Sequence, residues 1–433
     1  MQISKVTPIC NPIGYKKSKL GIIPEEWNII KLRDGTKRIG SGVTPKGGES
    51  VYIDDGIPLI RSQNVLVGKL SLIDVAYIST EIDDQMKNTR LMPMDVLLNI
   101  TGASIGRSCV VPKDLPNGNV NQHVCIIRTN EKLYPIYVVN FLNSIFGQKQ
   151  IFSFQAGGNR EGLNFNQIGS FIIPCPHYNE QKKIAEVLST WDLAIEKTEA
   201  LIKEKENLKK GLMQQLLTGK VRFKEFIEKE GFKDTKIGKV PEDWDIVMVK
   251  DFAKRNKNKV DPNEVDYKIK CIELEHIKQE TGQLLGWTDI REQSSLKNQF
   301  CSSDILFGKL RPYLKKYWFA TFNGACSSEI WVLQPKRQIV ANFLYYLVQT
   351  QKFIRICNIT SGTKMPRADW NIISSFHFPL PSISEQEKIS FFMLKMDNEI
   401  DSLIKKLSQY HSQKKGLMQQ LLTGKTRVKV DDT

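Results

Sequence analysis

The chain has 433 residues, of which 41% are hydrophobic and 25% are charged. These fractions are typical of globular proteins and exclude a largely disordered chain, and the length suits two or three domains. No apolar run approaches the roughly 18 residues that a membrane-spanning helix needs, and the first residues lack the apolar core of a signal peptide. We therefore expect a cytoplasmic protein with no membrane partner.

An excess of Lys and Arg gives the chain a formal net charge of +15. Such an excess attracts phosphates whatever their sequence context, so nucleic acid is the leading candidate partner. The alternative is that many lysines only solvate the surfaces of long helices. Composition does not separate these two interpretations.

Cysteine spacing argues against a metal site or a disulfide framework. No C-x-x-C pair occurs, and no cysteine has a partner at zinc-finger spacing. We predict reduced and mostly buried thiols. The eight cysteines are Cys10, Cys109, Cys125, Cys175, Cys271, Cys301, Cys326 and Cys357.

A long internal repeat organises the chain. The segment KKGLMQQLLTGK occurs unchanged at 209–220 and 414–425, and an offset of 205 aligns 171–220 with 376–425 at 21 identities in 50 pairs. The halves also begin alike, with KLGIIPEEW at Lys19 and KIGKVPEDW at Lys236. A long repeat that occurs twice indicates two tandem domains. Similar ends with dissimilar middles suggest that a common structural frame, formed by the ends, holds two middle segments that recognise different targets.

Each middle shows the same order of elements, which are mostly short apolar runs bounded by turn residues, followed by a segment with helical spacing. The pattern predicts an α+β module in each half. Strands are expected at 57–60, 95–100, 107–112 and 123–128, then a helix at 135–150. In the second half, strands are expected at 268–274, 304–310, 317–322 and 329–333, then a helix at 339–356.

After each module the sequence predicts a long helix of about 38 residues, or roughly 57 Å at 1.5 Å per residue. Apolar residues step alternately by four and three, which is typical of a coiled-coil seam, so the two helices should pair, either parallel or antiparallel. Ser384-x-x-Glu387 reads as a capping box at the second helix start, and Gly219 and Gly424 as terminators. Internal glycines at 211 and 416 suggest a close backbone crossing.

The predicted seam is mainly apolar in both copies. In the first copy it comprises Ile184, Leu188, Trp191, Ile195, Ile202, Leu212 and Leu216, with Thr198, Lys205 and Lys209 as polar positions. In the second copy it comprises Ile389, Met393, Met396, Ile400, Leu403, Leu407, Tyr410, Leu417 and Leu421, with Lys414 as the polar position.

No catalytic motif is evident. The chain has no P-loop, no G-x-G-x-x-G opening a helix after a strand, and no H-E-x-x-H. Acidic residues on one predicted strand region could be forced into a nuclease-like metal site, but a solvated face is the commoner explanation. The two alternative sets are Asp261, Asp266 and Lys268, or Glu273, Glu275 and His276. We expect a protein that binds without catalysis, with no metal site.

Polar and basic loops beside the predicted strands offer donors and acceptors for base edges and phosphates. The runs are TGASIGR, NGNVNQH and GGNR in the first half, and KLRPYLKK and GTKMPR in the second. The candidate DNA-binding residues are Lys46, Arg61, Thr101, Ser104, Arg107, Asn119, Asn121, Gln122, Arg160, Lys309, Arg311, Tyr313, Lys315, Lys316, Lys364 and Arg367. The alternative for each run is a solvated turn.

Taken in order, these features resemble the specificity (S) subunit of type I restriction-modification systems over essentially the full chain. The resemblance is carried by P-E-x-W at Pro24 and Pro241, G-x-T-P at 42–45, LLNITGASIG at 97–106, DILFGKLRPYLKK at 304–316, and the duplicated P-x-P, E-Q-x-K-I and KKGLMQQLLTGK segments. Each motif alone is weak. Duplicated and in this order, they are specific.

The resemblance implies two target recognition domains that each read half of a split DNA target, held apart by an antiparallel coiled coil. The implied divisions are 1–175 for recognition domain 1, 176–220 for the first helix, 221–380 for the linker and recognition domain 2, and 381–433 for the second helix and tail.

It also implies partners: double-stranded DNA, two copies of a methyltransferase (M) subunit, and a motor-nuclease (R) subunit. S-adenosylmethionine, ATP and Mg²⁺ are expected on those subunits, and no cofactor on this chain. Two other readings stay open, a metal-dependent DNA endonuclease that acts alone and a coiled-coil scaffold without DNA.

Overall fold

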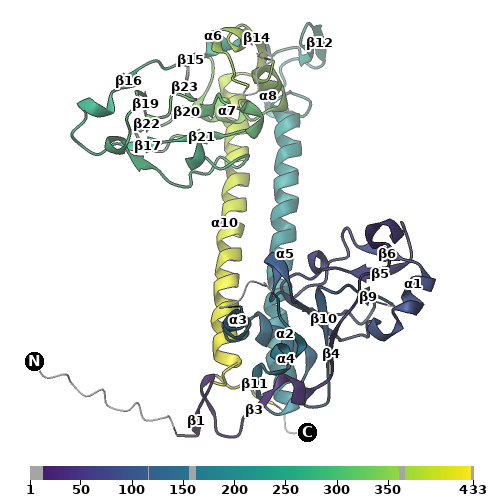
Figure 1. Ribbon diagram of the computed structural model, residues 1–433. Coiled ribbons are helices and arrows are strands. Elements are labelled where there is room, and N and C mark those ends of the chain that lie inside the picture. The colour runs from purple at the N-terminus through teal and green to yellow at the C-terminus, as the bar shows by residue number, and fades with distance from the viewer. Residues whose placement is uncertain (1–12, 116, 156–161, 360–365, 431–433) are drawn as a thin grey trace, which may run out of the picture. The chain divides into compact units, whose positions relative to one another are not determined.

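The computed structural model describes residues 13–115, 117–155, 162–359 and 366–430 (Figure 1). They form two compact units. Unit 1 contains the residues up to Glu199 together with those from Lys405 onward, and unit 2 is the continuous segment Ala200–Ile404. This grouping by contact differs from the division by repeat, and the domain boundaries at 175, 220 and 380 stay predictions.

Unit 1 is built on a four-stranded antiparallel sheet. Its order is β4 (Thr36–Ser41), β10 (Val124–Thr129), β7 (Val96–Asn99) and β8 (Ser108–Val110). Smaller sheets pair β6 (Ala76–Ile78), β5 (Ile57–Ile60) and β9 (Asn119–Val120), then β11 (Ile172–Cys175) with β3 (Asn28–Lys31), and β1 (Tyr15–Ser18) with β2 (Gly21–Pro24). The short helices are α1 (Thr80–Gln85), α2 (Pro135–Asn143), α3 (Ile145–Ser153) and α4 (Phe165–Gly169).

Unit 2 repeats the four-stranded sheet and enlarges the second one. The first is ordered β15 (Ala253–Arg255), β23 (Ile330–Pro335), β20 (Ile305–Gly308) and β21 (Tyr317–Phe319). The second is ordered β16 (Lys259–Val260), β19 (Lys297–Phe300), β22 (Gly324–Cys326), β17 (Lys270–Ile272) and β18 (Thr288–Asp289). The remaining pairs are β14 (Asp245–Met248) with β24 (His377–Leu380) and β12 (Phe232–Thr235) with β13 (Gly238–Pro241). The short helices are α6 (Val249–Phe252), α7 (Ala341–Leu347), α8 (Gln351–Cys357) and α9 (Trp370–Ile373).

The predicted strands are confirmed, but the helix predicted at 135–150 and the helix predicted at 339–356 are each divided into two shorter helices. The first breaks at Ser144, whose hydroxyl accepts hydrogen bonds from the backbone of Phe146 and Gly147 and caps α3. The second breaks before Thr350, whose hydroxyl accepts from Phe353 N and caps α8. A hydroxyl at an N-cap gives the backbone an alternative to continuing the helix.

The two long helices are α5 (Tyr178–Leu216) and α10 (Ile383–Leu421), each 39 residues long. Within each unit, a segment of one contacts a segment of the other. In unit 1, Trp191 packs edge-on against Tyr410 with ring centroids 5.6 Å apart, and Lys414 pairs with Asp192. In unit 2, Lys205 Nζ lies 2.7 Å from Glu399 Oε1, and Lys209 pairs with Asp397. In unit 1, His411 Nε2 also lies 3.9 Å from Glu199 Oε1. From Asp192–Lys414 to Glu199–His411, and from Lys205–Glu399 to Lys209–Asp397, residue numbers rise along α5 as they fall along α10, so the pairing is antiparallel.

These contacts also explain the three lysines of the predicted seam. Lys205, Lys209 and Lys414 each form an ion pair with a carboxylate of the facing helix. Apolar seam positions such as Leu188 and Met393 are fully buried. The seam is therefore confirmed, with cations where apolar residues are missing.

The ends of the long helices correct two predictions. Helix α10 starts at Ile383, and the hydroxyl that accepts from its first turn belongs to Ser382, which lies 3.3 Å from Glu385 N, so the capping box at Ser384 and Glu387 is wrong. A β-carbon added at Gly211 or Gly416 would meet no described atom within 4 Å, so the predicted close crossing is wrong as well.

The terminating glycines are confirmed. Gly219 and Gly424 have φ of +70° and +68°, a left-handed conformation that L residues other than glycine rarely adopt. Each also lies against the P-E-x-W segment of the same unit, since a β-carbon on Gly424 would be 2.5 Å from Pro24 Cδ. Gly219 packs against Pro241 and Trp244 in the same way.

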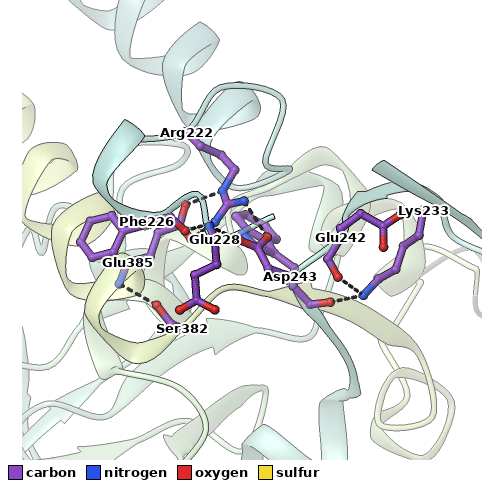
Figure 2. Close-up of polar contacts among 9 residues, drawn as sticks. Arg222, Phe226, Glu228, Lys233, Glu242, Asp243, Ser382 and Glu385 are labelled. Carbon is purple, nitrogen blue, oxygen red and sulfur yellow. Dashed lines mark hydrogen bonds and ion pairs between the residues drawn. The ribbon is translucent and has the colours of Figure 1, made fainter. Parts of the chain in front are cut away.

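An arginine just past each glycine fastens that P-E-x-W segment to the start of a long helix. In unit 2, Arg222 donates to both carboxylate oxygens of Glu385 at 2.9 and 2.8 Å and to Asp243 Oδ1 at 2.6 Å (Figure 2). Trp244 Nε1 donates to Glu385 at 3.1 Å. The carboxylates raise the pKa of Arg222, with Glu385 as the largest cause, so the guanidinium stays charged although it is almost buried.

Unit 1 holds the same arrangement. Arg427 donates to the two oxygens of Glu180 at 2.6 and 2.9 Å, Trp27 Nε1 donates to Glu180 at 3.1 Å, and Arg427 also pairs with Glu26. We call these two groups the Arg222 clamp and the Arg427 clamp. The glutamine next to each clamped glutamate, Gln181 or Gln386, accepts from a backbone N–H and donates to two backbone carbonyls of its own unit.

Each unit has its own hydrophobic core, to which both long helices contribute. In unit 1, Ile184 and Leu421 pack with Tyr137 and Phe141. In unit 2, Leu216 and Ile389 pack with Phe343. Clamp and core together fix each sheet to its helix pair, so the loops at the sheet ends have a rigid support.

Candidate nucleic-acid interface

Two loops that the sequence predicts separately meet in unit 1. Thr101 Oγ1 lies 2.7 Å from His123 Nδ1, and Gln122 Nε2 lies 2.8 Å from His123 Nε2. Gln122 Oε1 also accepts from the hydroxyl of Thr44, which belongs to the G-x-T-P segment at 42–45. Three chain segments thus place hydroxyl, amide and imidazole groups together, with Thr44 and Gln122 exposed. Such groups are able to read base edges.

Among the other candidate DNA-binding residues of unit 1, some are exposed and others form hydrogen bonds within the unit. Lys46 and Arg107 are exposed, and Arg61 lies 5.5 Å from the centre of the Tyr52 ring while it donates to Asp74 O at 3.1 Å. Ser104 accepts from Asn99 Nδ2 at 3.1 Å, and Asn121 Oδ1 accepts from His123 N at 3.1 Å.

Asn119 belongs to the interior. Its side chain is fully buried, accepts from the Thr89 hydroxyl at 2.6 Å and donates to Asp83 at 3.0 Å. These bonds satisfy both ends of the amide, so Asn119 is not on a surface that a duplex could contact.

The KLRPYLKK loop of unit 2 is strained. Arg311 and Lys315 have φ of +50° and +48°, a conformation that costs energy for residues with a β-carbon. Backbone bonds hold it there, since Arg311 N donates to Pro366 O at 2.8 Å and Ala368 N donates to Lys309 O at 2.9 Å. The surrounding structure therefore imposes this geometry, which leaves Arg311 and Tyr313 exposed.

Two of the four cations in this loop have partners inside unit 2. Lys315 Nζ lies 2.9 Å from Glu280 Oε1, and this contact is the main cause that lowers the pKa of Glu280. Lys316 Nζ donates to Leu274 O at 2.6 Å. For Lys309 and Arg311, the other two cations of this loop, no side-chain partner is found among the described residues, so they remain candidates for binding an external anion.

Arg367, at the end of the GTKMPR segment, lies beside the KLRPYLKK loop. Its backbone forms a bridge with Leu310, and its Nε donates to Glu329 at 3.1 Å. Lys309 and Arg367 also line a cavity with Arg255 and Trp370, two residues that the sequence did not single out. Arg160 and Lys364 lie outside the described residues.

Acidic residues considered for the endonuclease alternative form ion pairs and hydrogen bonds within unit 2. Glu273 Oε1 lies 2.6 Å from the almost buried Lys297 Nζ, and Asp261 accepts from Asn263 N at 2.9 Å. Over the described ranges, no three His, Cys, Asp or Glu residues are grouped to hold a metal ion. Within those ranges, too, no helix is both long and apolar enough to cross a membrane.

The cysteines agree with the sequence prediction where they are described. Seven are free thiols, and five of these are buried. Burial raises the pKa of Cys109 and Cys125 to about 12, which keeps these thiols protonated and unreactive. Cys10 lies outside the described residues.

Two like frames, each carrying a different mixed module and basic loops, define a duplicated nucleic-acid-recognition protein. The family model for the type I restriction modification DNA specificity domain matches residues 24–207 and again residues 241–409. The chain therefore belongs to this family and contains its domain twice, as the internal repeat predicted.

Individual relatives match this chain over almost its whole length or over about half of it. The type I restriction enzyme MjaVIII specificity subunit of Methanocaldococcus jannaschii is 24% identical over 427 residues, covering 94% of each chain. The EcoDI specificity subunit of Escherichia coli is 29% identical over 244 residues, which is 51% of this chain and 53% of that protein.

Solved structures share the fold. An S subunit of the type I restriction-modification system from M. genitalium aligns with a TM-score of 0.56 and 15% identity, covering 92% of this chain and 96% of that chain. A chain from a type I R-M system aligns with a TM-score of 0.55 and 13% identity, covering 93% and 99%. The predicted α+β fold with two tandem modules and long helices is confirmed.

Proposed function

We propose that this chain is the DNA-reading subunit of a type I restriction-modification complex. It reads a split, asymmetric target in double-stranded DNA, one half with each module. The observation that carries the proposal is the contrast within the chain, because two nearly identical clamps support modules whose exposed loops differ. The first offers Thr101, Gln122 and Arg107, and the second offers Lys309 and Arg311.

The long helices would set the distance between the two half-sites. Each has 39 residues and so a length of about 58 Å. B-DNA repeats every 34–36 Å or so, and a spacer of fixed length would hold two readers at a fixed number of base pairs. The antiparallel contacts within each unit support a spacer made from both helices.

The partners follow from membership of the family and from the duplication. Two equal frames offer two equivalent docking surfaces, which suits two copies of a methyltransferase subunit, and a motor-nuclease subunit would join the same complex. This chain contributes recognition and scaffolding and no catalytic group, and S-adenosylmethionine, ATP and Mg²⁺ bind to the partners.

The direct test is to map methylated bases in cells that carry this chain with its methyltransferase. We expect one bipartite motif with unlike halves and a spacer of constant length. A single continuous motif, or methylation that does not depend on this chain, would contradict the proposal. Cleavage of duplex DNA by the purified chain with Mg²⁺ would instead support the lone endonuclease.

The spacer is tested by lengthening it. Four residues inserted near Thr198 of α5, with four inserted at the facing level of α10, add about 6 Å of helix, or one to two base pairs. We expect the mapped spacer to grow by that amount. The same insertion after Lys229, in the exposed linker, is the control and should leave the spacer unchanged. An unchanged spacer in the helix variant would exclude the helices as its determinant.

A further inference from the structure

The cavity shared by Lys309 and Arg367 in unit 2 is basic and aromatic. It measures about 390 Å³, and the remainder of its lining comprises Arg255, Trp331, Ile359, Ala368, Asp369, Trp370 and Ile372. Trp370 is held edge-on by the buried Trp331, with ring centroids 5.7 Å apart. The cavity therefore has one fixed aromatic wall and three cations.

Unit 1 has a cavity at the equivalent place, of about 260 Å³. Its lining is Arg33, Thr36, Lys37, Arg38, Ile39, Phe165, Asn166 and Gly169. Arg38 and Arg255 are 217 positions apart, the offset at which the halves begin alike. Phe165 and Trp370 are 205 positions apart, the offset at which the halves end alike. Equivalent elements thus place an arginine and an aromatic ring in each cavity.

Two of the cavity arginines have carboxylate partners, since Arg367 pairs with Glu329 and Arg33 lies 3.8 Å from Asp34. Across the described residues, no side-chain hydrogen bond or ion pair involves Arg255 or Lys309, and Arg38 Nε is enclosed without a hydrogen-bond partner. The carboxylate in the unit 2 cavity, Asp369, accepts from Asn371 N at 2.9 Å. Within the described residues, Arg255 and Lys309 thus line one hollow without a carboxylate partner, and cations in this situation repel one another and favour an anion.

We infer that each cavity binds a phosphodiester group of the DNA backbone, held by Arg255 and Lys309 in unit 2 and by Arg38 and Lys37 in unit 1. The adjoining sugar lies against Trp370 or Phe165. The inference rests on the proposed function and extends it, because it assigns the sequence-independent part of binding to equivalent residues of the two frames. Base reading is left to the loops that differ.

Arginine suits this role because its planar guanidinium can donate two parallel hydrogen bonds to a phosphate. An aromatic ring beside it excludes water on one side and strengthens the charge interaction. A contact of this kind fixes the position of a module on the duplex and carries no sequence information. The two cavities would therefore set the register in which each module meets its half-site.

The test measures the affinity of the full chain for its mapped target duplex as a function of salt. Removing one phosphate contact reduces the slope of log K against log[salt] by about one. We expect Arg255→Ala and Arg38→Ala each to lower affinity several-fold and the slope by about one, and the double variant to lower the slope by about two. Because the contact carries no sequence information, the mapped motif should stay the same.

Lys229→Ala is the matched control, since it removes an exposed cation of unit 2 that does not line the cavity. If Arg255→Ala keeps the salt slope of this control while the wild-type chain binds its target, the cavity inference fails and the proposed function stands. If the wild-type chain does not bind the target at all, both fail.

Two further measurements separate the backbone from other ligands. Neutral methylphosphonate linkages, introduced one at a time, should reveal one position per half-site at which Arg255→Ala or Arg38→Ala has no additional effect. AMP added without DNA should leave the tryptophan fluorescence of the chain unchanged up to millimolar concentration. Quenching by micromolar AMP that Arg255→Ala abolishes, with an unchanged salt slope for DNA, would assign the cavity to a free nucleotide and overturn the inference.

Discussion

Each unit holds a buried aspartate at the equivalent position, but its hydrogen-bond partner is charged in unit 1 and neutral in unit 2. In unit 1, Asp95 accepts two hydrogen bonds from Arg128, both at 2.7 Å, across the sheet between β7 and β10. In unit 2, Asp304 accepts from the neutral amide of Gln334 at 3.0 and 3.1 Å. Burial then raises the pKa of Asp304. The framework tolerates a change of charge inside the module while it keeps the clamps unchanged.

This contrast shows which parts of the chain are free to diverge. The Arg222 and Arg427 clamps both join an arginine, a glutamate and a tryptophan at nearly the same distances, and only the second carboxylate differs, as Asp243 in one and Glu26 in the other. Within the modules, even the second sheet differs, with three strands in unit 1 and five in unit 2. Recognition can therefore vary without disturbing the support.

The largest expected effect comes from replacing one module. Exchanging residues 30–170 for the corresponding module of another family member should change one half of the methylated motif completely and leave the other half and the spacer intact. Motif mapping in cells gives the answer. The reciprocal exchange of the second module is the control, and a change in both halves from either exchange would contradict independent reading.

Both clamps should stabilise the fold, but we expect the Arg222 clamp to contribute more to the free energy of unfolding than the Arg427 clamp. Arg222→Ala leaves Glu385 and Asp243 buried without their cation, with side-chain exposures of 1% and 8%, at a cost of about 3–5 kcal/mol. Arg427→Ala should cost less, because Arg427 and Glu26 are exposed to 39% and 59%. Urea unfolding of the full chain measures both.

Two variants control this comparison. Arg222→Ala combined with Glu385→Gln should recover part of the loss, since no buried charge is left at that position. Lys183→Ala breaks an exposed pair with Glu186 and should change stability by less than about 1 kcal/mol. Equal losses for Arg222→Ala and Lys183→Ala would show that the clamp is not a determinant of stability.

The raised pKa of Asp304 predicts a pH dependence of stability that an arginine at position 334 should remove. Because the folded-state pKa of Asp304 is raised above its unfolded value, its stabilising contribution is present below the unfolded pKa and is lost as pH rises through the folded pKa. Gln334→Arg would recreate the arrangement of Arg128 and lower that pKa. Relative to wild type, the variant should gain about 1.4 kcal/mol with rising pH for each pKa unit lowered.

Urea unfolding at several pH values between 4 and 7 tests this prediction. Gln334→Lys is a useful control, because Lys carries the charge but cannot donate two hydrogen bonds in one plane. A Gln334→Arg variant whose stability follows the wild-type pH profile would contradict the assignment.

The smallest effect is expected in the helix seam. Lys205 and Glu399 are 30% and 50% exposed, so Lys205→Ala should cost about 0–1 kcal/mol. Lys205→Leu should be neutral or stabilising, since it restores the apolar spacing. Thermal unfolding compares the two variants. A loss larger than that of Arg427→Ala would mean that the seam depends on its charges.

The frame was predictable because its signals are local or repeated. Alternating steps of four and three placed the seam, and glycine at a helix end placed the terminators. The capping box failed because Ser382-x-x-Glu385 and Ser384-x-x-Glu387 have the same pattern two residues apart. Sequence cannot show that Glu385 is needed by Arg222 and Trp244 instead of by the helix start.

The clamp arginines were missed although a signal was present. K-x-R follows TG in both copies, at 220–222 and 425–427, so the repeat continues past the lysine with which the identical segment ends. The cavities carried no such signal, since Arg255, Lys309 and Trp370 come from three separated segments. Asn119 was misjudged because a run of amides does not show which of them faces inward.

The Arg427 clamp has a consequence for the order in which the protein can be made. Unit 2 is one continuous stretch of chain, so a nascent polypeptide contains all of it by Ile404. Unit 1 requires Arg427 to reach Glu180 and Glu26, contacts that span 247 and 401 residues of sequence. Contacts of such long range form slowly. On the ribosome, the module that is translated first should therefore be the one completed last.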